Sequence, residues 1–423
     1  MSPSPHTPFT LSGGVRRRWR PALALFIVTL AIVAAAAWLL RRPGLGADVG
    51  LAVGPSATTA ASDVPTDGAS STPSPSPTLN PTPTPVPTPS PRPSPSPTPI
   101  EATTNGVFVP AAEASLATRH VIAVMIDDQA AARPQSGLSE ADIVYQAPAE
   151  GGIPRYMALF QTQTPTSIGP VRSSRLYFVA WAEEWRALYV HAGGAPNALA
   201  ELHQQNGRLI YDGDEFRWGG GAGYLWRITT RYAPHNVYTS GAKLEALAKR
   251  LGATAEQTES PWTFVDDPPL ARRPVGGSIV VPYPENRIRY VYERTTDRYV
   301  RSVTGASPQV DVGDTAVVAP ADVVILRLSQ ARLANAPGQE NNIKKGRLDL
   351  GYLGHGQATV FAGGQVIAAT WSKASQTAPT LLTYASGPLK GQPVTLVRGQ
   401  VFVQVVPTTM AVTWTGGHPA NLR

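Results

Sequence analysis

The sequence contains no cysteine, and this absence excludes several classes of site. Without thiols the chain cannot form disulfides or use a thiolate nucleophile, and cysteine cannot ligate zinc or an iron–sulfur cluster. It also has no cysteine to carry a lipid anchor. Attachment to a membrane would therefore need a different device.

Acidic residues are absent from residues 1–46, which contain six arginines. The remaining 30 basic residues face 29 acidic ones, so almost all of the formal net charge of +7 lies in this first stretch. A nearly neutral remainder lacks the general basic excess of a non-specific nucleic-acid binder. We therefore expect no nucleic acid among its partners.

Charged residues are also absent from residues 21–40, an apolar run that follows Arg20. At ~1.5 Å per residue, a helix of this length spans roughly the ~30 Å hydrocarbon core of a bilayer. Four arginines precede the run and two follow it, so the positive-inside rule places residues 1–20 in the cytoplasm. A cleaved signal peptide is the alternative, because Ala34–Ala37 offers small residues. The length of the run favours an uncleaved single-pass anchor in the cell membrane, with everything after Leu40 outside.

Residues 41–117 are rich in proline, serine and threonine. From Pro73 to Pro99, proline occupies every odd position except Leu79. Such a tract cannot form a helix or sheet ladder and favours extended polyproline II. We expect a spacer that holds the folded part away from the bilayer.

The folded part is expected from residue 118, and its first half alternates strands and helices. Strands are expected at residues 120–127, 142–146, 155–161 and 187–191. Helices are expected after Ser173, which suits an N-cap, from Pro196 to about residue 205, and over residues 241–251. This alternation predicts an N-terminal α/β-type sheet domain over residues 118–270.

The second half changes character within residues 266–277, which are rich in proline and glycine. Strand patterns then follow with few helical ones, at residues 287–293, 298–302, 322–328, 357–361, 365–371, 380–384, 394–397 and 401–406. They predict a β-rich C-terminal domain over residues 271–415. The predicted fold class is therefore mixed α+β, preceded by the membrane helix and the proline-rich linker.

Several motifs of the chain resemble the YerB-like lipoprotein family. In the first half these are Met125–Asp127, Ala132–Leu138, Ala141–Tyr145, Glu150–Gly152, Gly169–Ser173 with Arg175, His191–Gly194 and Pro234–Asn236. In the second half they are Tyr299 with Arg301, Gly305, Asp311, Trp371 with Lys373, and Gly399–Pro407. The resemblance implies a two-domain extracytoplasmic protein over about residues 120–407, and it implies no reaction. The chain departs from the family in lacking a lipobox cysteine, which alters the tether and not the side of the membrane.

Arg172 and Arg175 are the first candidates for ligand binding. They lie at the expected start of a helix, where free N–H groups and the helix dipole favour an anion, and guanidinium groups match carboxylate or phosphate. The alternative is a structural ion pair with Asp142 or Glu150. The sequence leaves both interpretations open.

Other polar residues around this stretch complete a tentative anion-binding face. The set comprises Asp127, Arg133, Asp142, Glu150, Arg155, Arg172, Ser173, Arg175, His191, Gly193, Gly194, His235 and Asn236. Its carboxylates and histidines would also suit general acid–base chemistry, but no sequence spacing identifies a catalytic residue. We expect no metal and no cofactor.

Two functions remain open. The first is a membrane-anchored envelope protein that binds an anionic cell-wall component or a protein partner through the Arg172 and Arg175 face. The second is an extracytoplasmic hydrolase or transferase acting on cell-wall polymers. The sequence does not decide whether the chain is an enzyme.

Overall fold

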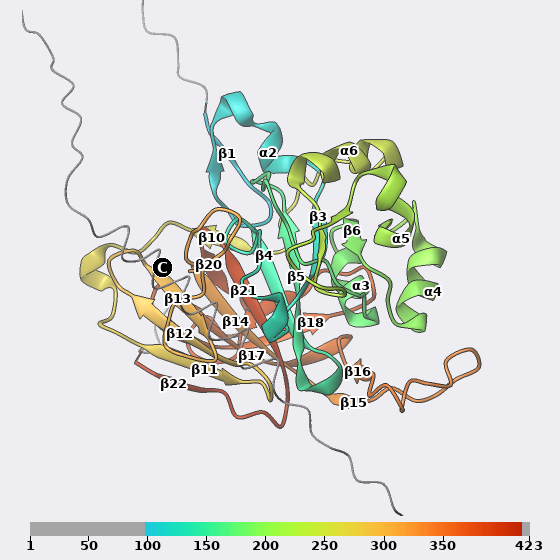
Figure 1. Cartoon of the computed structure of the whole chain (residues 1–423). Helices are drawn as coiled ribbons and strands as arrows, with labels where there is room; N and C mark the ends of the chain where they lie inside the picture. The colour runs from blue at the N-terminus through green and yellow to red at the C-terminus, as the bar shows by residue number, and fades with distance from the viewer. Residues whose placement is uncertain (1–97, 417–423) are drawn as a thin grey trace, which may run out of the picture. The chain divides into compact units, whose positions relative to one another are not determined.

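The computed structural model describes residues 98–416, which belong to one compact unit (Figure 1). The expected cytoplasmic tail, the membrane segment at residues 21–40 and most of the expected linker lie outside the described residues. None of the helices within residues 98–416 is long and apolar enough to span a bilayer.

A mixed sheet of ten strands runs through the middle of this unit (Figure 1). Its order is β19 (Leu381–Tyr384), β18 (Gln365–Lys373), β17 (Gly354–Ala362), β14 (Asp322–Leu328), β21 (Val401–Pro407), β4 (Ile143–Pro148), β5 (Pro154–Phe160), β3 (Ile122–Asp127), β6 (Leu188–His191) and β7 (Tyr211–Asp214). β21 pairs in parallel with β14 and β4, and β6 pairs in parallel with β3 and β7. The other neighbours are antiparallel.

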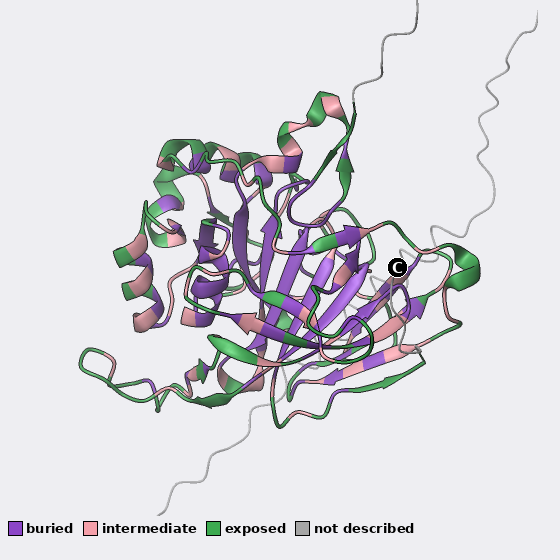
Figure 2. Cartoon of the chain, turned by 180° about the vertical axis from the view of Figure 1, so that it is seen from behind, coloured by how far each residue is buried: buried purple, intermediate pink, exposed green. Residues whose placement is uncertain are grey.

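Both faces of this sheet are covered, which explains why its central strands are continuous apolar runs. All residues of β3 and β4 are buried, and Figure 2 shows the buried strands at the centre of the unit. One face packs against helices α3 (Leu176–Glu183) and α4 (Pro196–Gln205) and against the pair β10 (Thr263–Val265) and β20 (Thr395–Val397). The other face packs against helix α6 (Gly241–Leu251) and a second, four-stranded sheet.

The four-stranded sheet has the order β13, β12, β11, β22 and is antiparallel. Its strands are β11 (Ser278–Pro282), β12 (Arg287–Glu293), β13 (Arg298–Val303) and β22 (Thr413–Thr415). The inward side chains of β12, Ile288, Tyr290 and Tyr292, alternate with more exposed ones, as expected for a sheet with one face in the core.

Short elements complete the described chain. The strands are β1 (Ile100–Glu101), β2 (Phe108–Val109), β8 (Trp226–Arg227), β9 (Val237–Tyr238), β15 (Gln330–Arg332) and β16 (Leu348–Leu350). The short helices are α2 (Ser115–Thr118), α5 (Glu215–Trp218), η1 (Ala111–Glu113), η2 (Ala130–Ala132), η3 (Glu150–Gly152), η4 (Gly220–Ala222) and η5 (Leu270–Arg272).

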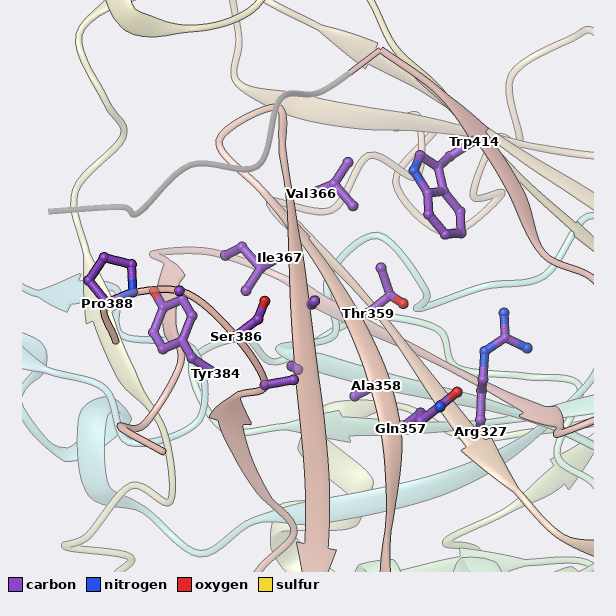
Figure 3. Close-up of a pocket in the computed structure, with 14 residues that line it drawn as sticks. Arg327, Gln357, Ala358, Thr359, Val366, Ile367, Tyr384, Ser386, Pro388 and Trp414 are labelled. Atoms are coloured by element: carbon purple, nitrogen blue, oxygen red, sulfur yellow. The ribbon is translucent and has the colours of Figure 1, made fainter. Parts of the chain in front are cut away.

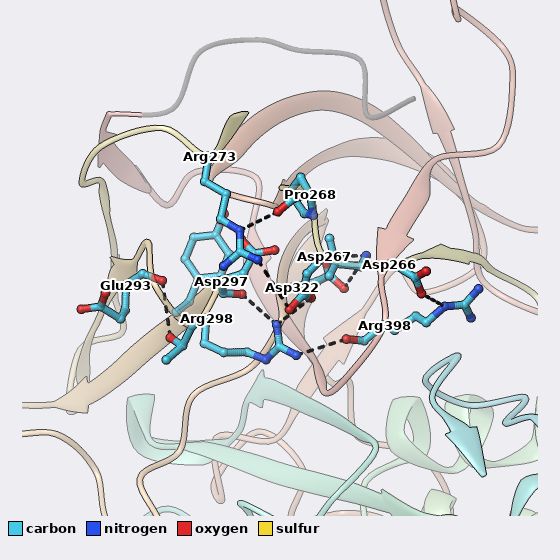
Figure 4. A network of polar contacts seen from close by, with 12 residues as sticks. Asp266, Asp267, Pro268, Arg273, Glu293, Asp297, Arg298, Asp322 and Arg398 are labelled. Atoms are coloured by element: carbon cyan, nitrogen blue, oxygen red, sulfur yellow. Dashed lines mark hydrogen bonds and ion pairs between the residues drawn. The ribbon is translucent and has the colours of Figure 1, made fainter. Parts of the chain in front are cut away.

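The two halves of the sequence share the large sheet, because β21 of the second half lies between β14 and β4. The connecting segment, residues 266–277, is held by ion pairs and hydrogen bonds (Figure 4). Arg298 lies 3.1 Å from Asp267, and Arg398 donates to Asp266 at 2.7 Å. Arg273 donates to the backbone oxygens of Pro268 and Arg294. The sequence change at this segment therefore marks a fixed connection within one compact unit.

Most expected elements are confirmed, and the mixed, strand-rich fold class is confirmed with them. Helices α4 and α6 occupy the expected residues, and α4 has proline in its first turn as expected. The expected N-cap at Ser173 is wrong. Helix α3 begins at Leu176 with Arg175 as its N-cap residue, and no side chain caps it.

The folded part also begins earlier than residue 118. Thr104 and Asn105 are buried, and their side chains donate to Gln161 Oε1 at 2.9 Å and to Asp142 Oδ1 at 2.5 Å. These bonds hold the β1–β2 hairpin against the sheet, so residues 100–117 do not belong to the linker.

Candidate functional site

An extended segment from Gly169 to Ser174 crosses the carboxyl ends of the parallel strands β3 and β6. Arg172 N donates to Met125 O at 2.9 Å, and Ala192 N donates to Arg172 O at 3.0 Å. Further along, Ser174 N donates to Gly193 O at 2.9 Å. The backbone N–H and C=O groups of this segment are hydrogen-bonded to β3 and to the residues after β6. Helix α3 can therefore begin only after Ser174. This bridging is the physical reason why Ser173 is not an N-cap.

Asp127, the last residue of β3, is the centre of a polar cluster that contains Arg172 and His235. Its Oδ2 lies 2.7 Å from His235 Nδ1 and 2.9 Å from Arg172 Nε. The Asp127 side chain is 2% exposed, whereas those of Arg172 and His235 are 19% and 15% exposed. A buried carboxylate thus holds two partly exposed cationic or potentially cationic side chains in place.

The Arg172 guanidinium has spare hydrogen-bonding capacity. Its Nε–H does not point at an acceptor even though the Asp127 carboxylate is close, so this contact is an ion pair without a hydrogen bond. Within residues 98–416, no acceptor is recorded for its two terminal nitrogens, and none for His235 Nε2. A guanidinium has five N–H donors, so Arg172 can accept an anionic ligand without losing its link to Asp127.

Arg175 differs from Arg172, because its Nε and Nη2 both donate to the carboxylate of Glu150. Its Nε and Nη2 each lie 2.5 Å from an oxygen of Glu150, a bidentate pair. Arg155 Nη2 lies 3.5 Å from the same carboxylate. Burial opposes ionisation of Glu150, but the hydrogen bonds and charge of Arg175, aided by Arg155, outweigh it and lower the pKa of Glu150. Arg175 therefore fits the structural ion pair that the sequence left open.

Arg155 connects the two clusters. Its backbone is opposite that of Asp127 in the pairing of β3 with β5, and its Nη1 donates to Ser173 O at 2.9 Å. Burial, together with the positive charges of Arg175 and Arg172, lowers the pKa of Arg155 to about 10. Arg172, Arg155 and Arg175 thus share the two carboxylates Asp127 and Glu150.

Asp142 lies at the other end of the sheet. Asp127 is opposite Arg155 on β5, whereas Ile143 is opposite Leu159, four positions further along. At ~3.3 Å per residue, the two ends are at least ~13 Å apart. Asp142 is 1% exposed and accepts hydrogen bonds from Asn105, Gln161 and Thr162. It is a structural residue and does not pair with Asp127 as a second acid.

His191 is near the segment but closed to solvent. It is fully buried, with Nδ1 2.9 Å from Gly193 O and Nε2 2.9 Å from Asp212 Oδ1. Gly193 N is also occupied, since it donates to Asp214 at 2.9 Å. These bonds tie β6 to β7, and Gly194 is held in a bridge with Ser174.

Arg133 and Asn236 belong to supporting contacts. Arg133 lies 3.5 Å from buried Asp128 and donates to Asn286, a residue of the second half. Asn236 accepts from Arg227 at 2.9 Å, and Arg227 also lies 3.0 Å from Glu215. The loop that carries His235 is thereby fixed to helix α5.

Two exposed aromatic side chains on and beside this loop, Tyr232 and Phe216, could not be predicted from the sequence. Tyr232 is 93% exposed, and its carbonyl accepts from His235 N at 2.9 Å in a tight turn. Phe216, 76% exposed, follows Glu215 on α5, and a Cβ added at Gly193 would meet its ring at 3.0 Å. No periodic pattern marks such residues, because single exposed aromatics have no regular spacing.

A separate cavity of about 680 Å³ contains none of the predicted residues (Figure 3). It lies along β17 and β18 and is lined by small and apolar side chains, with Tyr384 and Trp414 at its sides. The one charged lining residue, Arg327, already donates to Met410 O at 2.8 Å. Volume alone therefore does not make this cavity the better candidate site.

Within residues 98–416, no group of three or more histidine, aspartate or glutamate side chains is arranged to hold a metal ion. Arg172 and His235 therefore lie together on Asp127, and each keeps nitrogen atoms without a recorded acceptor among residues 98–416.

Comparisons with known proteins agree with the two-part layout. Residues 109–254 match the family described as "Protein of unknown function (DUF3048) N-terminal domain", and residues 279–403 match its C-terminal domain. The "Putative lipoprotein YerB" of Bacillus subtilis is 30% identical over 318 residues, which are 72% of this chain and 87% of that protein. The crystal structure of YerB from Bacillus subtilis superposes with a TM-score of 0.63 at 27% identity, over 75% of this chain and 99% of that one.

Proposed function

Because the chain belongs to the YerB-like family of DUF3048 proteins, we propose that it is an extracytoplasmic envelope protein that binds an anionic wall component through Arg172. The observation that carries the proposal is the Arg172 guanidinium, which is partly exposed, oriented by Asp127 and free at both terminal nitrogens among the described residues. His235 Nε2 would donate a further hydrogen bond to the anion when the imidazole is protonated.

The location outside the membrane rests on two arguments. The relative is called a putative lipoprotein, a class attached to a membrane surface. This chain has no cysteine, so its uncharged segment at residues 21–40 would serve as the anchor, with residues 1–20 in the cytoplasm. Protease added to intact cells should then digest the folded part. Protection in intact cells, with digestion after lysis, would contradict this topology.

The anion site is tested by retention of the full chain on purified, insoluble cell-wall fragments. Arg172→Gln removes the charge and keeps much of the side-chain volume, so retention should fall at least about tenfold, since a charge-assisted hydrogen-bond pair contributes roughly 1.5–3 kcal/mol. Arg272→Gln is the control for the change in charge, because Arg272 is exposed and lies on η5 away from the cluster. Equal retention of the two variants would sink the proposal.

A second candidate function is supported by the contact between Asp127 and His235. A carboxylate 2.7 Å from Nδ1 orients the ring, and Nε2 stays available as a general acid or base. A hydrolase or transferase acting on wall polymers would use this pair. No hydrogen bond joins the Ser173 hydroxyl to His235 in residues 98–416, so Ser173 is not proposed as the nucleophile that this pair would activate.

One variant, His235→Asn, distinguishes the enzyme from the binding protein. His235→Asn should abolish release of soluble fragments from wall polymers if the chain is an enzyme, whereas binding through Arg172 should weaken only modestly. An absence of released fragments with the wild-type chain would leave binding as the function.

A further inference from the structure

A second concave and basic surface lies on the other side of the η3 turn. It is a pocket of about 640 Å³ at the junction of η3, the β11–β12 turn, the β15–β16 hairpin and the end of β21. Its volume is within the range of small-ligand pockets, which often form where parts of a protein meet. The loop that joins β15 to β16 projects from the body of the unit next to it (Figure 1).

All charged residues that line this pocket are cationic: Arg332, Lys344 and Lys345. Within residues 98–416, none of the three has an ion-pair partner. A Cβ placed on Gly346 would lie 3.6 Å from Arg332 Nη1, so the Arg332 side chain reaches the turn that carries both lysines. We name this set the basic pocket.

No acidic residue is among those that line the basic pocket. Glu285 lines a smaller depression with Gln129 and Asn286, although its Cγ would lie 3.9 Å from a Cβ placed on Gly152 at the edge of the basic pocket. Glu340 accepts from Gly338 N at 2.7 Å within its own loop. Asp349 is opposite Ala331 on the β15–β16 hairpin, so its side chain points to the other face from those of Arg332 and Leu348. Three unpaired cations in one concave surface are therefore available to an anion.

The η3 turn separates the basic pocket from the Arg172 cluster. Glu150 of this turn pairs with Arg175 and Arg155, whereas Gly151 and Gly152 line the basic pocket. No protein atom lies within 4 Å of the position that a Cβ on Gly151 would occupy, so this side of the turn is open. Two basic surfaces thus lie on opposite sides of one short turn.

We infer that the basic pocket binds a second anionic group of the same ligand, which makes the ligand class a polymer with repeated phosphate or carboxylate groups. This inference rests on the proposed function at Arg172. Two linked sites would bind such a polymer far more tightly than its monomer, because the second contact forms at a high effective concentration.

The test is titration of the full chain with inorganic polyphosphate, orthophosphate and poly-L-glutamate. The pocket variant Arg332→Gln/Lys344→Gln/Lys345→Gln should bind polyphosphate about tenfold more weakly, as three exposed charge contacts predict. The control variant Lys243→Gln/Lys249→Gln/Arg272→Gln carries the same charge change at exposed positions on α6 and η5. It should stay within about twofold of the wild type. Comparison of polyphosphate with poly-L-glutamate distinguishes a phosphate polymer from a carboxylate polymer.

Three results decide the inference. Equal weakening of the pocket and control variants overturns it, because only net charge would then matter. Weakening by Arg172→Gln with no specific effect of the pocket variant also overturns it, while the proposed function stands. A specific effect of the pocket variant with none from Arg172→Gln overturns the proposed role of Arg172 and the two-site inference with it, because the basic pocket would then be the anion site alone. All exposed positions in these variants tolerate glutamine without loss of core packing, which a thermal melt verifies.

Discussion

Replacing Glu183 with glutamine should stabilise the protein above neutral pH and have little effect in acid. Glu183 is the last residue of α3 and is 1% exposed, and neither carboxylate oxygen has a hydrogen-bond partner in the described part of the chain. The neighbouring Lys373 is taken by Glu184, whose Oε1 lies 2.8 Å from Nζ. Burial raises the pKa of Glu183 to about 7. The nearby Gln376 amide and the charge of Lys373 oppose this increase, whereas the charge of Glu201 adds to it.

The sign follows from comparing the folded and unfolded states. The ordinary pKa is 4.5, so between pH 4.5 and about 7 the folded state holds a proton that the unfolded state has released. Stability therefore falls as pH rises through this window, and the loss is complete above about 7. At ~1.4 kcal/mol per pKa unit the full loss is about 3 kcal/mol, and residual solvent screening reduces it to about 2 kcal/mol.

The assay is urea unfolding of wild type and Glu183→Gln at pH 5 and pH 8. We expect the variant to gain about 2 kcal/mol at pH 8 and less than ~0.5 kcal/mol at pH 5, because glutamine removes the buried charge and keeps the shape. Glu256→Gln, at an exposed position, should change neither value. A gain of the same size at both pH values would refute the reasoning, since it would show that the effect does not depend on ionisation.

Two further predictions concern the segment around Arg172. Arg175→Gln should cost about 3 kcal/mol in urea unfolding, because it leaves Glu150 with only the longer contact to Arg155. The double variant Arg175→Gln/Glu150→Gln should recover part of this loss, and a double variant less stable than the single one would contradict the assignment. Ser173→Ala should change stability by less than ~0.5 kcal/mol, whereas Ser240→Ala should cost about 1 kcal/mol, because Ser240 accepts from Lys243 N as the cap of α6. If both serine variants lost the same free energy of unfolding, Ser173 would have to act as a helix cap, contrary to the structure.

The sequence could predict the elements whose pattern is local. Pro196 at the first position of a helix and Ser240 before a helix fix the starts of α4 and α6 through nearby backbone geometry and hydrogen bonds. The apolar runs at β3 and β4 indicate strands buried on both faces. It also placed Asp127, Arg172 and His235 in one candidate set, although it gave no distances.

Tertiary structure alone decided which of these residues meet. Arg172 and Arg175 are three positions apart and chemically alike, yet Glu150 saturates Arg175 and leaves Arg172 with free donors. Spacing along the chain cannot reveal this, because Glu150 arrives through the folding of η3 against the start of α3.

Local sequence patterns likewise cannot predict which strands, distant in the sequence, pair with one another. β21 lies between β14 and β4, and this position makes the two halves one sheet. Strand propensity depends on a few neighbouring residues, whereas strand order depends on how the whole chain buries its apolar surface. The same holds for the basic pocket, since Lys344 and Lys345 become part of a concave surface only when the hairpin packs beside Gly151 and Gly152.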